Sequence, residues 1–112
     1  MTATKNSLKV VTWNANSIKS KIPEFSNFIT QNDYDIAGIC ETKLDKSSNL
    51  NFSGFKTYCC NRNSRGGGVA IIVKNNIKHS VLKFNLSSKI EAVGIKTITN
   101  STQLIICQTL KQ

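Results

Sequence analysis

The chain has 112 residues, of which 15 are Lys or Arg and 6 are Asp or Glu, so its formal net charge is +9. This length suits one domain, and a composition that is 39% hydrophobic and 19% charged excludes a wholly disordered chain. No apolar run approaches the roughly 20 residues of a membrane-spanning helix, and no signal-type apolar stretch follows the polar N-terminus. We therefore expect a protein of the nucleus or cytoplasm that is not secreted.

The first third of the chain predicts a strand-helix-strand unit. After a flexible tail over residues 1–7, the apolar and β-branched run at 8–14 is typical of a strand. Pro23 suits the first turn of a helix, and apolar residues then recur at spacings of three and four as far as Gln31. Residues 36–40 predict a second, buried strand. A right-handed crossover would leave the two strands parallel.

The rest of the chain predicts strands. Residues 43–53 are predicted to be a polar loop, and the strands that follow are separated by turn residues. These strands are expected at 55–60, 68–74, 80–86, 91–97 and 103–109. Residues 69–73 are apolar at every position, which is typical of a central strand covered on both faces. Because only one helix is predicted, we expect the chain to lack part of its own covering layer and to belong to a larger domain.

The four cysteines predict neither a disulfide scaffold nor a zinc site. Cys40 and Cys107 lie in apolar runs and are expected in the core. Cys59 and Cys60 are neighbours, so they would point to opposite faces of a strand. No C-x-x-C pair occurs, and the single His79 cannot complete a zinc site; we expect it at the surface or in a turn.

Two polar residues at the ends of the predicted parallel strands form a candidate site. Asn14 ends the first strand, and Glu41 directly follows the second. Parallel strands end at the same edge of a sheet, where ligands bind in α/β proteins. A carboxylate there is a natural ligand for Mg²⁺, and an amide can hold a phosphate oxygen. Spacing alone leaves open the alternative that Asn14 caps a turn and Glu41 is merely solvated.

Four segments in sequence order carry a family resemblance. They are VTWNANS at 11–17, IAGICETKL at 36–44, GFKTY at 54–58 with RGGGVAIIV at 65–73, and IEAVGI at 90–95. Together they resemble the endonuclease/exonuclease/phosphatase superfamily, and most of all the apurinic-type endonuclease domains of non-LTR retrotransposons. The resemblance covers roughly residues 8 to 107. Ser17 departs from it, because many relatives have glycine there.

The resemblance implies a fold and roles for two residues. The fold would be α/β, the N-terminal half of a four-layer α/β sandwich with a mixed sheet and one clear helix, so that residues 8–112 form a truncated domain. Asn14 would be the active-site asparagine and Glu41 the acidic ligand of Mg²⁺. A tyrosine-proline segment, an aspartate-asparagine pair and a C-terminal aspartate-histidine pair of the family have no counterpart here. We therefore expect weak or absent Mg²⁺ binding and no activity by the chain alone.

Basic residues near the same edge are candidate contacts to nucleic acid. The positive net charge favours polyanionic partners, nucleic acid before acidic membrane surfaces. Lys19 and Lys21 follow the first strand and Lys43 follows the second; such lysines would neutralise phosphates without reading bases. Arg62 and Arg65 lie in a glycine-rich hairpin that could contact DNA. Each of these groups could equally lie in a solvated loop, and the lysines, which are scattered, could serve solubility alone.

Several functions remain open from the sequence. The leading hypothesis is a truncated Mg²⁺-dependent DNA endonuclease domain that nicks the target site of a non-LTR retrotransposon. Its partner would be DNA, and it would not bind a membrane. Within the parent protein it could also contact the missing C-terminal half or a reverse transcriptase domain. A second hypothesis is a non-catalytic basic module that binds nucleic acid without Mg²⁺ and loses affinity with salt. A third changes the substrate to a phospholipid or inositol phosphate, and a fourth is an inert remnant.

Overall fold

The computed structural model describes residues 7–44, 50–60, 67–82, 90–99 and 102–111. Within these residues the regular elements are, in chain order, β1 (Val10–Asn14), the 3₁₀ turn η1 (Lys19–Lys21), α1 (Ile22–Gln31), β2 (Ile36–Cys40), β3 (Phe55–Cys60), β4 (Val69–Lys74), β5 (His79–Leu82), β6 (Ile90–Thr99) and β7 (Thr102–Lys111). No helix in this part of the chain is long and apolar enough to cross a membrane. The predicted helix and the predicted order of strands are confirmed.

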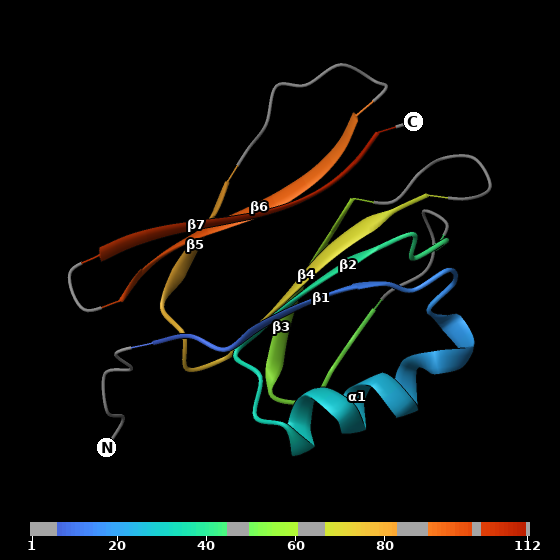
Figure 1. Cartoon of the computed structure of the whole chain (residues 1–112), viewed down its shortest axis with the longest axis horizontal. Helices are drawn as coiled ribbons and strands as arrows, with labels where there is room; N and C mark the ends of the chain where they lie inside the picture. Colours follow the sequence, from blue (N-terminus) through green and yellow to red (C-terminus); the bar gives the residue numbers. More distant parts are fainter. Residues whose placement is uncertain (1–6, 45–49, 61–66, 83–89, 100–101, 112) are drawn as a thin grey trace.

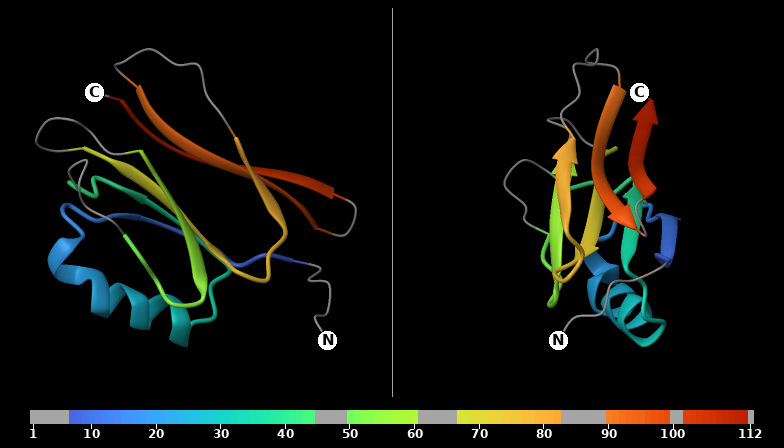
Figure 2. Two further views of the ribbon diagram at one scale, coloured as in Figure 1. Left: turned by 180° about the vertical axis from the view of Figure 1, so that it is seen from behind. Right: turned by 90° about the vertical axis from the view of Figure 1, so that its left-hand side faces the viewer.

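The strands form two sheets, one packed over the other (Figure 1, Figure 2). The first sheet has the order β1-β2-β4-β3, with β1 parallel to β2 and the other neighbours antiparallel. The second sheet has the order β5-β6-β7 and is antiparallel throughout. Helix α1 covers the face of the first sheet that points away from the second (Figure 1). The predicted α/β class, mixed sheet and parallel first pair are confirmed.

Helix α1 packs on the first sheet through an apolar stripe. Pro23 lies in its first turn, where the missing N–H removes no helical hydrogen bond. Phe25 and Ile29 are buried, and the Phe25 ring stacks on Trp13 of β1 with their centroids 4.7 Å apart. Phe28, which its spacing predicts on the same stripe, is 43% exposed. It lies at the margin of the interface, where it lines a groove beside β1.

Strand β4 is covered on both faces by the chain itself. Every side chain of Val69–Val73 is fully buried. Ala70 and Ile72 pack in the cluster that includes α1, whereas Ile71 and its neighbours on the other face pack in a cluster with Val93 and Ile95 of β6. The expectation that the chain lacks a covering layer is therefore wrong for β4. A second sheet supplies that cover, which a count of helices does not anticipate.

The segment after β2 also differs from its prediction. Residues 43–53 are predicted as a polar loop, yet Leu44, Leu50 and Phe52 are each at most 5% exposed and belong to the core under α1. The Phe52 ring meets the Phe25 ring edge-on at 5.9 Å. These apolar residues are scattered among polar ones without a helix or strand period, so the pattern gives no signal of burial.

Strand β1 lies at an edge of the first sheet. Among the described strands its one neighbour is β2. Val11 and Trp13 pack toward α1, while Val10, Thr12 and Asn14 on the opposite face are exposed. Val10 is 40% exposed. The second sheet therefore covers the middle of the first sheet but does not extend over β1.

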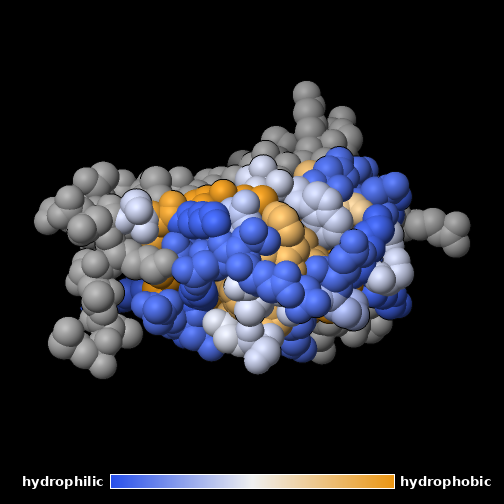
Figure 3. All heavy atoms as spheres, turned by 60° about the horizontal axis from the view of Figure 1, so that its bottom comes forward, coloured by the Kyte–Doolittle hydropathy of each residue, from blue (hydrophilic) through white to orange (hydrophobic). Residues whose placement is uncertain are grey.

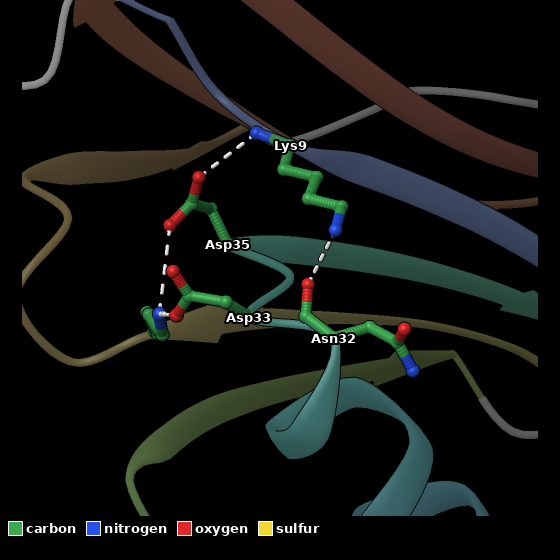
Figure 4. Close-up of polar contacts among 5 residues, drawn as sticks. Lys9, Asn32, Asp33 and Asp35 are labelled. Atoms are coloured by element: carbon green, nitrogen blue, oxygen red, sulfur yellow. Dashed lines mark hydrogen bonds and ion pairs between the residues drawn. The ribbon is translucent and has the colours of Figure 1, made fainter.

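A buried carboxylate ties the other end of the sheet together. Asp35, which is 1% exposed, precedes β2 and accepts a hydrogen bond from the backbone N–H of Lys9 at 2.8 Å (Figure 4). The Lys74 ammonium lies 3.8 Å from the Asp35 carboxylate and also pairs with Asp33. The Lys9 ammonium donates to the backbone carbonyl of Asn32 (Figure 4). Both aspartates therefore have structural roles at the end of β2 opposite Glu41.

Replacing the two central isoleucines of β4 tests whether both of its faces are covered. We expect Ile71→Ala and Ile72→Ala each to lower the free energy of unfolding by about 2–5 kcal/mol, because each leaves a cavity in a packed cluster. The measurement is urea unfolding followed by circular dichroism. Val81→Ala on β5 is the control, because Val81 is 45% exposed and should change the stability by less than about 0.5 kcal/mol. A loss at Ile71 as small as that of the control would show that the second sheet does not cover this face.

Candidate active site

The predicted site residues meet at one edge of the first sheet. Asn14 ends β1 directly opposite Cys40, the last residue of β2, and the Ala15 N–H donates to the Cys40 carbonyl at 2.9 Å. Glu41 is the next residue after this pair. Asn14 is exposed and Glu41 is half-buried, so both can be reached from solvent. The prediction that the two residues lie at the same edge is therefore confirmed.

Backbone hydrogen bonds hold the segment after β2 from two sides. On one side, N–H groups of the loop after β1 donate to carbonyls of the segment after β2. On the other side, N–H groups of the segment after β2 donate to carbonyls of the residues just before β4. The bonds are Ser17 N–H to Glu41 O at 2.9 Å, Ile18 N–H to Thr42 O at 3.1 Å, Thr42 N–H to Gly68 O at 3.1 Å and Lys43 N–H to Gly67 O at 2.7 Å. Glu41 is thus carried by a backbone fixed on both flanks.

The same edge concentrates unusual backbone conformations. Of the five non-glycine residues with positive φ in the described part of the chain, four lie here: Asn16 (46°), Ser17 (81°), Glu41 (54°) and Lys43 (55°). Such conformations are uncommon away from glycine, and they gather at functional sites when the surrounding structure enforces them. The edge is therefore set apart from the rest of the fold by its backbone as well as by its side chains.

Lysines surround the edge and brace its loops. The Lys21 ammonium donates to the carbonyls of Ala15 and Asn16, at 2.6 and 3.3 Å. The Lys43 ammonium donates to the Asn16 side-chain oxygen at 2.7 Å and is exposed. Lys19 is exposed on η1, which follows the same loop. Positive charge is therefore available beside Asn14 and Glu41.

The two predicted arginine contacts are not described by the structure. Arg62 and Arg65 lie in residues 61–66, outside the described residues. Their suggested role in contacting DNA remains a prediction.

A groove of about 650 Å³ runs beside Asn14, between β1 and α1. Its walls include the aromatic residues Trp13 and Phe28 and the charged residues Lys21 and Glu24. Viewed from the side of α1, apolar surface shows between hydrophilic side chains (Figure 3). The sequence gives no sign of this groove, because it arises from the way a helix overhangs an edge strand.

His79 has a structural role away from this edge. Its Nδ1 lies 2.8 Å from the Ile77 carbonyl, which can only accept, so Nδ1 carries the hydrogen. In the neutral ring, Nε2 then accepts a hydrogen bond from the Tyr58 hydroxyl at 2.8 Å. This pair joins β3 of the first sheet to β5 of the second. His79, predicted at the surface or in a turn, is a half-buried link between sheets.

The thiol of Cys40 reports on the electrostatics of the edge. Burial raises the pKa of Cys40, and the neighbouring Glu41 carboxylate raises it further because a second negative charge is unfavourable there. Cys40, Cys59 and Cys60 are free thiols. The side chain of Cys107 lies outside the described residues.

The donors at the edge suit a hard cation. Among the described residues no group of three or more His, Cys, Asp or Glu side chains could hold a metal. Mg²⁺ does not need such a group, because it accepts one or two carboxylates and completes its shell with water and substrate phosphate oxygens. Glu41 offers one carboxylate on a fixed backbone, and Asn14 ends the neighbouring strand opposite the residue before Glu41. This donor set fits Mg²⁺ and does not fit zinc.

Comparison with known sequences places this fold in a family. The sequence profile of the Endonuclease/Exonuclease/phosphatase family matches residues 11–106. The chain belongs to this family. The matched range contains both Asn14 and Glu41, and the predicted resemblance to the superfamily is confirmed.

Individual proteins and a solved structure that are similar to this chain extend the comparison. The chain is 30% identical over 87 residues to a probable RNA-directed DNA polymerase from transposon X-element of Drosophila melanogaster, covering 75% of this chain and 10% of that protein. It is 28% identical over 98 residues to the corresponding protein from transposon BS of the same organism, covering 84% and 11%. The crystal structure of AP endonuclease LMAP from Leishmania major has a TM-score of 0.68 at 16% identity, covering 92% of this chain and 40% of that one. The chain thus spans less than half of each of these relatives.

The pKa of Cys40 should respond to the charge of Glu41. We expect Glu41→Gln to lower this pKa, because the substitution removes a negative charge that disfavours the thiolate. The rate of Cys40 alkylation by iodoacetamide should therefore rise at a lower pH than in the wild type. Mass spectrometry of the modified peptides gives the rate at each cysteine.

Cys59 is the internal control for this measurement. Its pKa is raised by desolvation of the thiol and then by Cys60, with no contribution from Glu41. Its pH profile should stay the same in Glu41→Gln. A shift of both profiles together would point to a change in the whole fold.

Proposed function

We propose that residues 8–112 form the N-terminal half of a Mg²⁺-dependent DNA endonuclease domain, within a longer transposon protein that also carries a reverse transcriptase. The observation that carries this proposal is the convergence of Asn14 and Glu41 on one strained, lysine-lined edge. The family of the chain supports phosphodiester chemistry, and the transposon relatives support DNA as the substrate. Coverage of only 40% of the Leishmania enzyme supports a domain that continues beyond these residues.

Each residue at the edge would have a distinct role in this chemistry. Glu41 would hold Mg²⁺, and the Asn14 amide would bind a phosphate oxygen or orient the Glu41 carboxylate. When bound, the metal supplies charge stabilisation at the phosphoryl oxygens and an acidified water. Lys19 and Lys43 would neutralise phosphates of the DNA backbone, with Arg62 and Arg65 as further contacts.

The isolated chain should lack part of this machinery. Hydrolysis also requires a group that takes a proton from the attacking water. The single histidine is engaged by Tyr58 and Ile77 between the sheets, and Asp33 and Asp35 lie at the opposite end of β2. The described residues therefore supply no histidine base beside Glu41. We propose that the chain alone binds Mg²⁺ weakly and does not cleave DNA.

Metal binding and cleavage test this proposal together. We expect Mg²⁺ to shift the backbone amide signals of Glu41 and its neighbours in ¹⁵N NMR spectra, with an affinity in the millimolar range, and Glu41→Gln to remove the effect. Supercoiled plasmid should remain intact with Mg²⁺ and with EDTA. Nicking that requires both Mg²⁺ and Glu41 would support the site and contradict the expected inactivity. A spectrum unchanged by Mg²⁺ would contradict the metal role of Glu41.

Salt dependence tests the role of the lysines in DNA binding. We expect Lys19→Ala and Lys43→Ala each to weaken binding to all sequences alike and to reduce the slope of log K against log salt by about 1. Fluorescence anisotropy of a labelled duplex provides the measurement. Lys56→Ala is the matched control, because Lys56 is also exposed but lies on β3, at the far edge of the sheet. Equal effects of all three substitutions would indicate diffuse attraction by the net charge.

The same binding experiment separates the proposal from a non-catalytic module. That alternative predicts equal DNA affinity with and without Mg²⁺ and no effect of Glu41→Gln. Mg²⁺ held by Glu41 should instead strengthen binding at constant ionic strength, because it places a further positive charge at the phosphates.

A further inference from the structure

The turn that carries Glu41, residues 41–43, is hydrogen-bonded to two glycines directly before β4. It is called the Glu41 turn below. Thr42 and Lys43 donate their N–H groups to the carbonyls of Gly68 and Gly67, at 3.1 and 2.7 Å. Both glycines have left-handed backbones, with φ of 91° at Gly68 and 70° at Gly67. Lys43, which is left-handed itself, thus bonds to left-handed Gly67, and Thr42, the residue between left-handed Glu41 and Lys43, bonds to left-handed Gly68.

Gly68 is required by space as well as by conformation. A Cβ atom at this position would lie 2.2 Å from Thr42 Oγ1 and 3.6 Å from the Lys43 nitrogen. Thr42 is fully buried, so its side chain has no solvent-filled space into which it could retreat. A larger residue at position 68 therefore requires the Thr42 side chain or the adjacent backbone to shift, and Thr42 is joined directly to Glu41.

The contact between Thr42 and Gly68 is one of shape. Thr42 Oγ1 is buried, and within the described residues it has no hydrogen-bond partner. Because a buried hydroxyl without a partner costs free energy, this hydroxyl does not stabilise the fold through a hydrogen bond. Its physical effect is to fill the space above Gly68 and to hold the backbone on either side.

We propose that Gly68 and Thr42 are positioning residues for the Glu41 carboxylate. Their close contact maintains the left-handed backbone at Glu41 and Lys43, and this backbone fixes the direction in which the carboxylate leaves the sheet edge. The inference rests on the proposed function, in which Glu41 holds Mg²⁺. It assigns the glycines before β4 a role in metal binding, although they have no side chain that could touch the ion.

Substitution at Gly68 provides the direct test. We expect Gly68→Ala to weaken Mg²⁺ binding about tenfold or more, which is the usual effect of disturbing a group that orients a ligand. Binding is read from the amide shifts of the turn during a Mg²⁺ titration, and thermal melting confirms that the variant is folded. The control is Gly54→Ala: Gly54 also has a positive φ, of 84°, but a Cβ there would meet nothing within 4 Å. It should lose stability and keep the wild-type Mg²⁺ affinity.

A double substitution separates the lost contact from general damage. Thr42→Ala alone should weaken Mg²⁺ binding, because it leaves a gap above Gly68. Combining Thr42→Ala with Gly68→Ala should recover part of the affinity, because the methyl group added at one position occupies the space vacated at the other. Additive losses in the double variant would overturn the proposal, as would an unchanged affinity in Gly68→Ala.

Two further measurements keep the test decisive. If Gly68→Ala does not fold, Thr42→Val and Thr42→Ala replace it: valine preserves the shape and should preserve affinity, whereas alanine should not.

If the wild type binds no Mg²⁺, the metal role of Glu41 fails on its own. The positioning role is then judged by the three-bond HN–Hα couplings of Glu41 and Lys43, which report φ. These couplings should change in Gly68→Ala and stay constant in Gly54→Ala, and unchanged couplings in both would overturn the inference.

Discussion

The parallel pairing of β1 with β2 is the constraint on which the other features of the site depend. It aligns Asn14 with Cys40, so the loop after β1 and the turn after β2 begin at the same level of the sheet. Their N–H and C=O groups can then bond to each other, and the glycines before β4 complete the arrangement from the other side. Without this register, the backbone at Glu41 would lack the hydrogen bonds that fix it to the loop after β1. The chemistry of the edge is therefore a consequence of strand order.

Much of this architecture is predictable from the sequence, because its signals are local. A β-branched run, an amphipathic stripe with Pro23 at its start and a second apolar run specify the strand-helix-strand unit, and four segments in the right order indicate the family. The missed features are non-local. The second sheet covers Ile71, Phe52 lies beneath α1, and His79 bonds to Tyr58 across two sheets. These depend on how elements meet in space, which no periodicity along the chain encodes.

The site itself divides in the same way. The positions of Asn14 and Glu41 at one edge are predictable because both residues stand at the ends of recognisable strands. The contact of Gly68 with Thr42 is not, since it joins residues 26 positions apart through a backbone approach that only the structure reveals. Glycines in a hairpin suggest a turn, and nothing in their sequence indicates that they support a carboxylate. Strained backbone at Glu41 and Lys43 is likewise invisible before the fold is known.

The exposed edge of β1 has a practical consequence for the chain in solution. Edge strands are usually protected from self-association by charged residues, proline or a bulge, and the β1 sequence VVTWN contains no charged residue and no proline. Among the described strands the outer edge of β1 has no partner, and exposed Val10 flanks it on one face and the groove on the other. Such an edge can template the addition of a strand from another copy, so we expect association of this chain to depend on its concentration.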